Sequence, residues 1–299
     1  MKYLKYLNKN IPSLEGKIYV ITGSNSGIGF SLAMQLAYKG ASIVMACRSK
    51  DRAIEAKEKI LKEVENAKID ILLMDQSSFE SIRSFVKELT SKYEHIDGFI
   101  FNAGIYHPKK GMVTKEGIAL TIGTNYVGPY YLSMLLKDYF IKCHTRIVVI
   151  NSFVQPFGRY KASKALTNKY SVYKSYNVSK RCDIALAVHL YDELKDNCLV
   201  LLSHPGMAST NIAFGKDSGV PTLAKKLSRK FMYLMGNDMY KSSLTTCLAL
   251  SEDALPLTNY VPRLPFHIKG YPKKIKTSPD KYRDDELYKL TEELITSKL

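Results

Sequence analysis

The chain has few cysteines, and they are scattered. No two of them have the Cys-Xaa2-Cys spacing, and most lie in apolar stretches, as buried thiols do. This distribution indicates a reducing compartment. The histidines show no ligand spacing either, so we predict that the protein has no metal site. The cysteines are Cys47, Cys143, Cys182, Cys198 and Cys247.

Long apolar runs are also missing. No run reaches about 18 residues, the length at which a segment becomes a candidate for crossing a bilayer. The first ten residues, MKYLKYLNKN, are too polar for a signal peptide. From these two absences we expect a soluble, cytoplasmic protein.

Basic residues are abundant, but they do not cluster. The formal net charge is +16, from 44 Lys and Arg against 28 Asp and Glu, and the lysines are spread along the whole chain. Zinc-finger spacing and RNA-binding signatures are absent. We interpret the charge as a solvated surface and predict no nucleic-acid partner.

Strand-like and helix-like patterns alternate along the chain. With 299 residues, 45% of them apolar, it can bury a sizeable core. Short apolar runs alternate with amphipathic stretches, a pattern typical of βαβ units. We predict an α/β fold, a doubly wound Rossmann-type parallel sheet in a single domain over residues 1–299. The expected strands are 18–22, 42–46, 69–74, 98–101, 146–150 and 199–203. The expected helices are 27–39, 51–65, 79–93, 118–140 and 173–196.

Three glycines follow the first expected strand, where the sequence reads Thr-Gly-Ser-Asn-Ser-Gly-Ile-Gly. Gly23 permits a sharp turn, Gly27 permits backbone to approach a pyrophosphate, and Gly29 permits close packing of helix on strand. The helix that follows offers its free N–H groups to phosphates. The motif alone also fits a tight turn without a ligand. The predicted dinucleotide-binding residues here are Gly23, Ser24, Asn25, Ser26, Gly27, Ile28 and Gly29.

The end of the second strand bears on the type of cofactor. An NAD site usually has an acidic residue there, but this chain reads Ala-Cys-Arg-Ser-Lys, with Arg48 in the middle. A guanidinium binds a 2′-phosphate well, so we predict NADP(H), although Arg48 also fits as a solvated residue. Asp75 ends the third strand. It could accept from the adenine amino group or help to cap the next helix with Ser77 or Ser78.

Several strand ends combine into a more specific pattern. They read Asn102-Ala103-Gly104, Asn151-Ser152 and His204-Pro205-Gly206, and Tyr176-Asn-Val-Ser-Lys180 stands on an expected helix. With the glycine motif, this order resembles the short-chain dehydrogenase/reductase family over roughly residues 14–212. The glycine motif, the Ala-Cys-Arg triplet and Ser-Pro at 278–279 look most like the retinol-dehydrogenase-like branch.

The resemblance implies a role for each matching position. Tyr176 would donate or accept the proton at the substrate oxygen, and Ser152 would orient the carbonyl. Lys180 would hold the nicotinamide ribose and lower the phenol pKa from about 10, an effect that its i+4 position also favours. Asn125 would complete a proton relay through water. The implied cofactor contacts are Asn102, Ala103, Gly104, Pro205, Gly206 and Thr210, besides Tyr176 and Lys180.

Tyr-Xaa3-Lys recurs in this tyrosine-rich chain. Tyr160 and Lys164 form the serious competitor, because Ser163 precedes that lysine as well. Tyr176 precedes Pro205 by 29 residues, enough for one long helix and the next strand. Tyr160 precedes Pro205 by 45, an interval that needs an extra element. The spacing therefore favours Tyr176.

The last third of the chain is less regular. Residues near 207–240 are expected to cover the substrate, and residues near 280–297 to form a C-terminal helix. The amphipathic segment 220–235 fits an ordinary surface helix, a lid over an apolar substrate, or a segment that touches an anionic membrane. A homodimer through the helices at 118–140 and 173–196 is a further hypothesis, because relatives commonly dimerise there.

We predict an NADP(H)-dependent oxidoreductase that acts on an apolar carbonyl or alcohol. One alternative is a non-catalytic dinucleotide-binding sensor or scaffold. Such a protein would not need the set Ser152, Tyr176, Lys180 and Asn125. Another is a different nucleotide-dependent enzyme such as a methyltransferase, which would leave Tyr176 and Lys180 unexplained.

Overall fold

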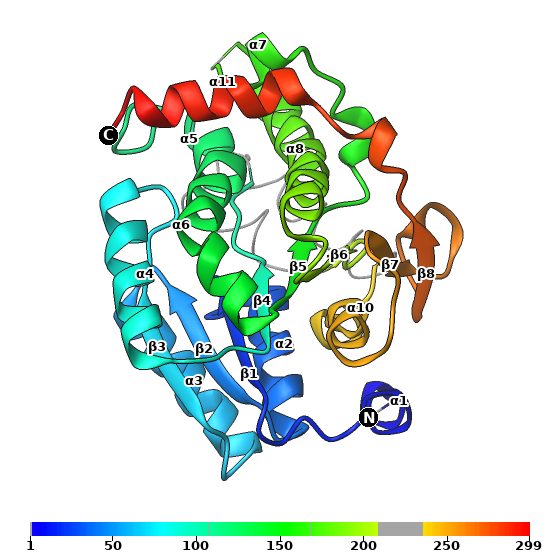
Figure 1. Cartoon of the computed structure of the whole chain (residues 1–299). Helices are drawn as coiled ribbons and strands as arrows, with labels where there is room; N and C mark the ends of the chain where they lie inside the picture. The colour runs from blue at the N-terminus through cyan, green and yellow to red at the C-terminus, as the bar shows by residue number, and fades with distance from the viewer. Residues whose placement is uncertain (1, 107, 168, 209–235) are drawn as a thin grey trace.

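A computed structural model describes residues 2–106, 108–167, 169–208 and 236–299 (Figure 1). The strands are β1 Ile18–Thr22, β2 Ser42–Cys47, β3 Ile69–Leu73, β4 Gly98–Phe101, β5 Arg146–Ile150, β6 Leu199–Ser203, β7 Thr258–Pro262 and β8 Pro272–Lys276. The helices are α1 Lys2–Asn10, α2 Gly27–Tyr38, α3 Lys50–Glu63, α4 Phe79–Lys92, α5 Leu120–Ile122, α6 Gly128–Cys143, α7 Ala162–Ala165, α8 Val172–Leu194, α10 Met239–Ser251 and α11 Asp285–Thr296. A π-helical turn occupies Gly123–Val127, and 3-10 turns occupy Gln155–Phe157, Pro265–His267 and Pro279–Lys281.

One sheet carries all eight of these strands, in the order β3-β2-β1-β4-β5-β6-β7-β8. Strands β1 to β7 pair in parallel, and β8 joins β7 antiparallel. The predicted doubly wound Rossmann-type fold is therefore confirmed. The six predicted strands are present, with ends that differ by one residue at β2 and β3. Strands β7 and β8 extend the sheet beyond the prediction.

Helices cover both faces of the sheet. Side chains from α4, α6, α8 and α11 pack with one face in a core that includes Val20, Phe99 and Val149. Side chains from α1, α2, α3 and α10 pack with the other face, in a core that includes Ile21, Ile43 and Val148. Neighbouring residues of one strand thus enter opposite cores, which explains why the strands read as continuous apolar runs.

The expected helix at 118–140 contains a π-helical turn. After the short α5, the Gly128 N–H bonds to the Gly123 carbonyl, which makes this turn, and α6 begins at Gly128. Pro129 favours the turn, because proline has no N–H to donate to the carbonyl four residues earlier. The backbone keeps right-handed helical dihedral angles on both sides, so the helix continues through a turn that the prediction did not include. Helices α3, α4 and α8 differ from prediction by only one or two residues at their ends.

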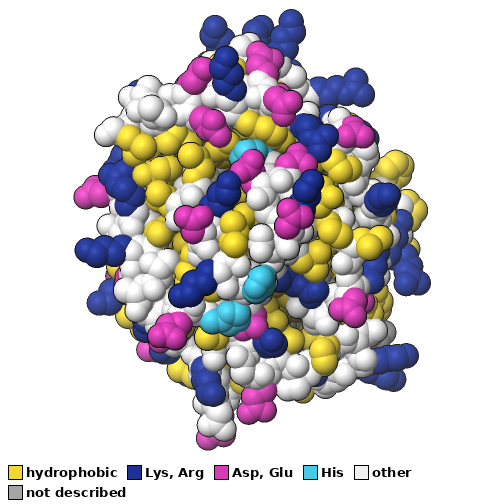
Figure 2. All heavy atoms as spheres, viewed as in Figure 1, with side chains coloured by type: hydrophobic (Ala, Val, Ile, Leu, Met, Phe, Trp, Pro, Cys, Tyr) yellow, Lys and Arg dark blue, Asp and Glu magenta, His cyan; other side chains and the backbone are white. Residues whose placement is uncertain are grey.

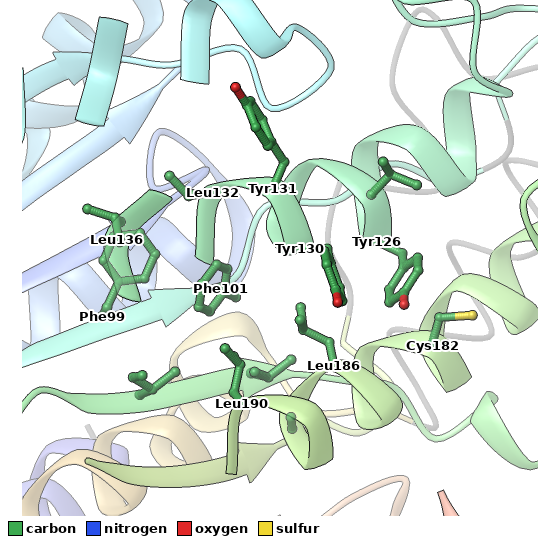
Figure 3. Close-up of a cluster of buried hydrophobic side chains, with 14 of the residues drawn as sticks. Phe99, Phe101, Tyr126, Tyr130, Tyr131, Leu132, Leu136, Cys182, Leu186 and Leu190 are labelled. Carbon is green, nitrogen blue, oxygen red and sulfur yellow. The ribbon is translucent and has the colours of Figure 1, made fainter. Parts of the chain in front are cut away.

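The C-terminal helix α11 lies against α6 and α8 (Figure 1). Tyr288 donates from its hydroxyl to the Ala185 carbonyl at 2.8 Å, and Tyr130 donates to Glu292 at 2.9 Å. Tyr126 and Tyr130 point into the core between α6 and α8 (Figure 3). Within the segment 118–140, where a homodimer interface is the hypothesis, Tyr126, Tyr130, Tyr131 and Leu136 are buried in this core, and Leu135 is exposed.

Figure 2 shows Lys and Arg side chains interspersed with Asp and Glu over the viewed face. None of the helices in the described ranges is long and apolar enough to span a bilayer.

Thr210 and the segment 220–235 lie outside the described residues, and the lid stays a prediction.

Candidate active site

The carboxyl ends of the central strands open onto a cavity of about 1280 Å³. Ligands in doubly wound sheets bind at this edge. Most of the predicted site residues line the cavity. They are Gly23, Asn25, Ser26, Gly27, Ile28, Gly29, Arg48, Asp75, Asn102, Ala103, Gly104, Ser152, Tyr176, Lys180, Pro205 and Gly206.

The glycine turn is clamped by the end of β4. The Asn102 side-chain amide donates to the Thr22 carbonyl at 2.6 Å, and the Thr22 hydroxyl accepts from the Ala103 N–H at 2.8 Å. Gly23 has a φ of +67°, and a Cβ there would stand 2.9 Å from the Ala103 Cα. At Gly29 a Cβ would meet the Asn102 amide nitrogen at 2.5 Å. Both glycines are therefore required by close packing against β4.

Helix α2 begins at this turn without a capping side chain. Ser26 is the N-cap residue, yet its hydroxyl accepts no bond from the first turn of α2. The N–H groups of that turn and the positive end of the helix dipole suit a phosphate. Ser24, which was predicted as a cofactor contact, does not line the cavity. Its buried hydroxyl donates to the Ile21 carbonyl at 3.0 Å, so it fixes the turn from inside.

Arginines line the cavity beyond β2. Arg48 is exposed at the end of that strand, and Arg52 follows on α3. Asp75 also lines the cavity, and its carboxylate accepts from both the N–H and the hydroxyl of Ser77. The cap of α4 belongs to Ser78, which accepts from the Ser81 N–H. Asp75 therefore holds a turn at the rim rather than capping the helix itself.

Tyr176, Ser152 and Lys180 line the same cavity. Burial raises the pKa of the Tyr176 phenol, while the charge of Lys180 and the nearby Ser152 hydroxyl lower that pKa. The Lys180 Nζ lies 6.0 Å from the centre of the Tyr176 ring. This arrangement places a titratable hydroxyl, a second hydroxyl and a cation together, which is the set needed for proton transfer to a carbonyl oxygen.

The competing Tyr160 has different surroundings. It lies in the loop before α7 and does not line the cavity. Burial raises the pKa of its phenol, as it does for Tyr176. The two tyrosines therefore differ in position, and Tyr176 is the one that the fold brings to the cavity.

Asn125 lies in the π-helical turn behind the cavity. Its side-chain oxygen accepts from the Ile105 N–H at 2.8 Å, and its amide donates to the Ile105 carbonyl at 3.0 Å and to the Ser179 hydroxyl at 3.0 Å. All these bonds join protein groups, so the side chain holds the segment after β4 against α8. A role in a proton relay remains a prediction.

Two contacts at the site had not been predicted. Asp183 is buried beside Lys180, with its Oδ2 2.8 Å from the Nζ. Its i+3 spacing from Lys180 was visible in the sequence, but an acid at that spacing is usually a solvated partner. Tyr106 lines the cavity, with its ring edge-on to Tyr176 and the ring centres 4.7 Å apart.

His204, at the end of β6, has a structural role. Its Nδ1 accepts from the Gly206 N–H at 3.1 Å, and burial lowers the pKa of the ring to about 3. The imidazole is therefore neutral and shapes the Pro205-Gly206 turn. In the described part of the chain, no three His, Cys, Asp or Glu side chains gather as metal ligands would.

Comparisons with known proteins identify relatives. The model of the family described as short chain dehydrogenase matches residues 17–219. The WW domain-containing oxidoreductase of Homo sapiens is 31% identical over 253 residues, which are 79% of this chain and 59% of that protein. Retinol dehydrogenase 14 of Mus musculus is 31% identical over 228 residues, 72% of this chain and 67% of that protein. The chain spans 49% to 59% of the length of the WW domain-containing oxidoreductases that it matches.

Solved structures share the fold. A Mycobacterium paratuberculosis protein of uncharacterised function is 23% identical and covers 96% of each chain, with a TM-score of 0.71. A proposed NAD(P)-dependent gluconate 5-dehydrogenase from Beutenbergia cavernae, which holds NADP at low occupancy, is 20% identical with a TM-score of 0.62. The match covers 81% of this chain and 92% of that one.

Proposed function

Because the chain belongs to the short-chain dehydrogenase/reductase family, and resembles its retinol-dehydrogenase-like branch, we propose that it is an NADP(H)-dependent oxidoreductase. It transfers hydride between nicotinamide and a carbonyl or alcohol, and Tyr176 is the acid and base. The observation that carries the proposal is the meeting of Tyr176, Ser152 and Lys180 in the cavity that the glycine turn also lines.

The residues present fit a nicotinamide dinucleotide. The uncapped first turn of α2 and the backbone of residues 23–29 would hold the pyrophosphate. Asn102, Ala103 and Gly104 would line the path from there to the reaction site. The nicotinamide, when bound, supplies or accepts the hydride.

The protein's own groups handle the proton and the substrate oxygen. In reduction, Ser152 donates a hydrogen bond to the carbonyl oxygen and Tyr176 gives that oxygen its proton. In oxidation, Tyr176 as phenolate takes the proton from the alcohol. Lys180 favours the phenolate because an ammonium nearby stabilises the negative charge. Its Nζ is held by the Ile150 carbonyl at 3.1 Å, so the charge stays in place beside the phenol.

Arginine at the end of β2 supports the preference for NADP(H). Arg48 lines the cavity where an acidic residue would repel a 2′-phosphate, and Arg52 adds a second guanidinium on α3. Guanidinium groups bind phosphate bidentately, so together they suit a phosphorylated ribose.

Apolar and aromatic side chains support an apolar substrate. Ile105, Tyr106, Phe153, Val154 and Met207 line the same cavity as Ser152 and Tyr176. Burying an apolar carbonyl compound against them is favourable, by about 25 cal/mol for each Å² removed from water.

Turnover with a panel of aldehydes, ketones and alcohols tests the proposal. The wild-type protein is expected to oxidise NADPH with at least one apolar carbonyl. Tyr176→Phe is expected to lose turnover and keep NADPH affinity, because only the hydroxyl is removed. Tyr160→Phe is the matched control and is expected to keep most activity. Tight NADPH binding without turnover on any member of the panel would favour the sensor or scaffold alternative.

The assembly and location of the protein are part of the same proposal. We propose a cytoplasmic enzyme that forms a homodimer through the outer faces of α6 and α8. The exposed Met134 and Leu135 on α6 support this face. Sedimentation at micromolar concentration tests the dimer. Salt-sensitive co-sedimentation with anionic vesicles tests peripheral membrane contact.

A further inference from the structure

Lys180 carries a buried partner that changes how its charge acts. The Asp183 Oδ2 accepts from the Lys180 Nζ at 2.8 Å, and the two side chains are only 5% and 7% exposed. The same Nζ donates to the Ile150 carbonyl at 3.1 Å. Two N–H groups of the Lys180 ammonium thus donate to protein acceptors. Its positive charge pairs with the Asp183 carboxylate in a buried environment that largely excludes water.

A paired cation affects a third group less than a free one does. The positive charge of Lys180 lowers the pKa of Tyr176, and the negative charge of Asp183 raises it. Burial of the phenol raises the pKa as well. The ion pair therefore acts on Tyr176 more as a dipole than as a charge, and the phenol keeps its proton over a wider range of pH.

We propose that Asp183 is a positioning residue that acts through Lys180 to keep Tyr176 neutral, and so suits the site to carbonyl reduction at neutral pH. This inference rests on the proposed function. Reduction needs the phenol as proton donor, and oxidation needs the phenolate. An enzyme whose tyrosine is protonated at neutral pH is ready to reduce, and it gains oxidising activity only as the pH rises.

The state of Asp183 itself depends on its surroundings. Burial raises the pKa of the carboxyl to about 6, while the Lys180 charge opposes that rise. The carboxylate is therefore ionised at pH 7 and takes up a proton below pH 6. In the described ranges, the titratable side chains coupled to it are Lys180, Tyr176 and Cys182, all on α8. The Ile150 carbonyl, the other acceptor of the Lys180 ammonium, brings no net charge.

The variant Asp183→Asn removes the negative charge of the side chain and nearly keeps its size and shape. Asparagine keeps an oxygen for the Lys180 Nζ but has no negative charge. The pH at which alcohol oxidation reaches half of its maximum is expected to fall by about one unit, because the ammonium is no longer neutralised. Asp183→Glu, which restores the charge, is expected to return the profile toward wild type. Asp192→Asn is the matched control, since Asp192 lies on the same helix but pairs with Arg283 at the surface.

A second measurement does not depend on turnover. The oxidised nicotinamide ring is positively charged and the reduced ring is neutral, so an uncompensated Lys180 disfavours NADP⁺ relative to NADPH. In Asp183→Asn the ratio of the Kd for NADP⁺ to the Kd for NADPH is expected to rise about fivefold. The wild-type ratio is expected to rise likewise between pH 7 and pH 5. The phosphates titrate in both cofactor forms and cancel in this ratio, so the wild-type series tests the inference even if the variant fails to fold.

The outcomes distinguish the inference from the proposed function. A wild type that binds both cofactor forms but reduces no carbonyl overturns the function. A wild type that turns over, with an Asp183→Asn profile and Kd ratio that match those of Asp192→Asn, overturns the inference alone. A wild-type Kd ratio that stays constant from pH 7 to pH 5 also counts against it.

Discussion

Asn125 bonds both backbone groups of Ile105, accepting from its N–H at 2.8 Å and donating to its carbonyl at 3.0 Å. One side chain thus replaces the partner that a neighbouring strand would offer to this segment. Gly104 lies directly before it, where a Cβ would stand 3.7 Å from the Lys180 Nζ. The bonds of Asn125 therefore set how closely the segment after β4 approaches Lys180.

Asn125→Ala is expected to weaken substrate binding more than catalysis. The change leaves two backbone groups of Ile105 without partners, which costs about 1 to 3 kcal/mol for each buried group. Ile105 lines the cavity, so KM for the carbonyl substrate is expected to rise about tenfold, while kcat falls less. Steady-state kinetics at saturating NADPH measure both constants. If Asn125 serves a proton relay instead, kcat falls and KM stays constant.

Arg48→Asp is expected to reverse the cofactor preference. An acid at the end of β2 repels the 2′-phosphate, so the Kd for NADPH should rise about 100-fold and the Kd for NADH should change little. Fluorescence titration with each cofactor measures the two constants. Lys50→Asp makes the same charge change two residues away, at an exposed position outside the cavity lining. Equal losses for NADPH and NADH, or a wild type that prefers NADH, would contradict the prediction.

Gly29→Ala tests the packing of α2 on the sheet. Alanine in a helix is normally favoured over glycine by about 1 kcal/mol. Here the new Cβ would lie 2.5 Å from the Asn102 amide nitrogen and 2.6 Å from the Gly23 carbonyl oxygen, so the helix must shift. We expect a net destabilisation of about 2 kcal/mol and at least about tenfold weaker NADPH binding. Denaturant unfolding and cofactor titration measure these changes. Unchanged NADPH affinity would mean that the turn adjusts without moving α2.

His204 is expected to make the fold sensitive to acid. Burial lowers its pKa to about 3 in the folded state, against about 6.5 when unfolded. The unfolded chain therefore binds more protons below pH 6.5. The stabilisation is complete above that pH and is lost as the pH falls toward 3, by up to about 1.4 kcal/mol per unit.

His204→Asn isolates this contribution. Asparagine keeps an oxygen that can accept from the Gly206 N–H but does not titrate. The free energy of unfolding, measured in denaturant at pH 7, 6 and 5, is expected to fall less steeply for the variant than for the wild type. A smaller slope is expected to remain, because burial lowers the pKa of His189 as well. Identical slopes would show that His204 does not carry the effect.

The central sheet could be predicted because its strands are buried on both faces. The later strands give no such signal. In β7 the polar Thr258 and Asn259 precede Tyr260 and Val261, and β8 reads Pro-Lys-Lys-Ile-Lys. Such segments become strands only through their partners. Helix α10 was missed for a related reason, since it buries small hydroxyl side chains such as Ser243, which bonds Ser31 on α2 at 2.8 Å.

Residue types of the site could be predicted from motifs, but their partners could not. Spacing alone separated Tyr176 from Tyr160. Nothing local distinguishes the buried Asp183 from a solvated acid, because its burial results from β5 and the π-helical turn packing against α8. Asn125 and Ile105 likewise bond across a separation of 20 residues. Long-range packing decides these contacts. A local sequence pattern identifies one residue of each contact but not its distant partner.

The reactivity of the five buried cysteine thiols reports local opening of the two hydrophobic cores. Cys143, Cys182 and Cys198 lie in one core, and Cys47 and Cys247 lie in the other. Burial raises the pKa of the Cys198 thiol to about 11. A buried thiol of this kind reacts with an alkylating reagent only when the structure around it opens. Pulsed alkylation followed by mass spectrometry therefore reads which side of the sheet opens first. The Cys47 Sγ lies 3.5 Å from the Ser24 hydroxyl in the glycine turn, so its labelling rate also reports how firmly a bound dinucleotide holds that turn closed.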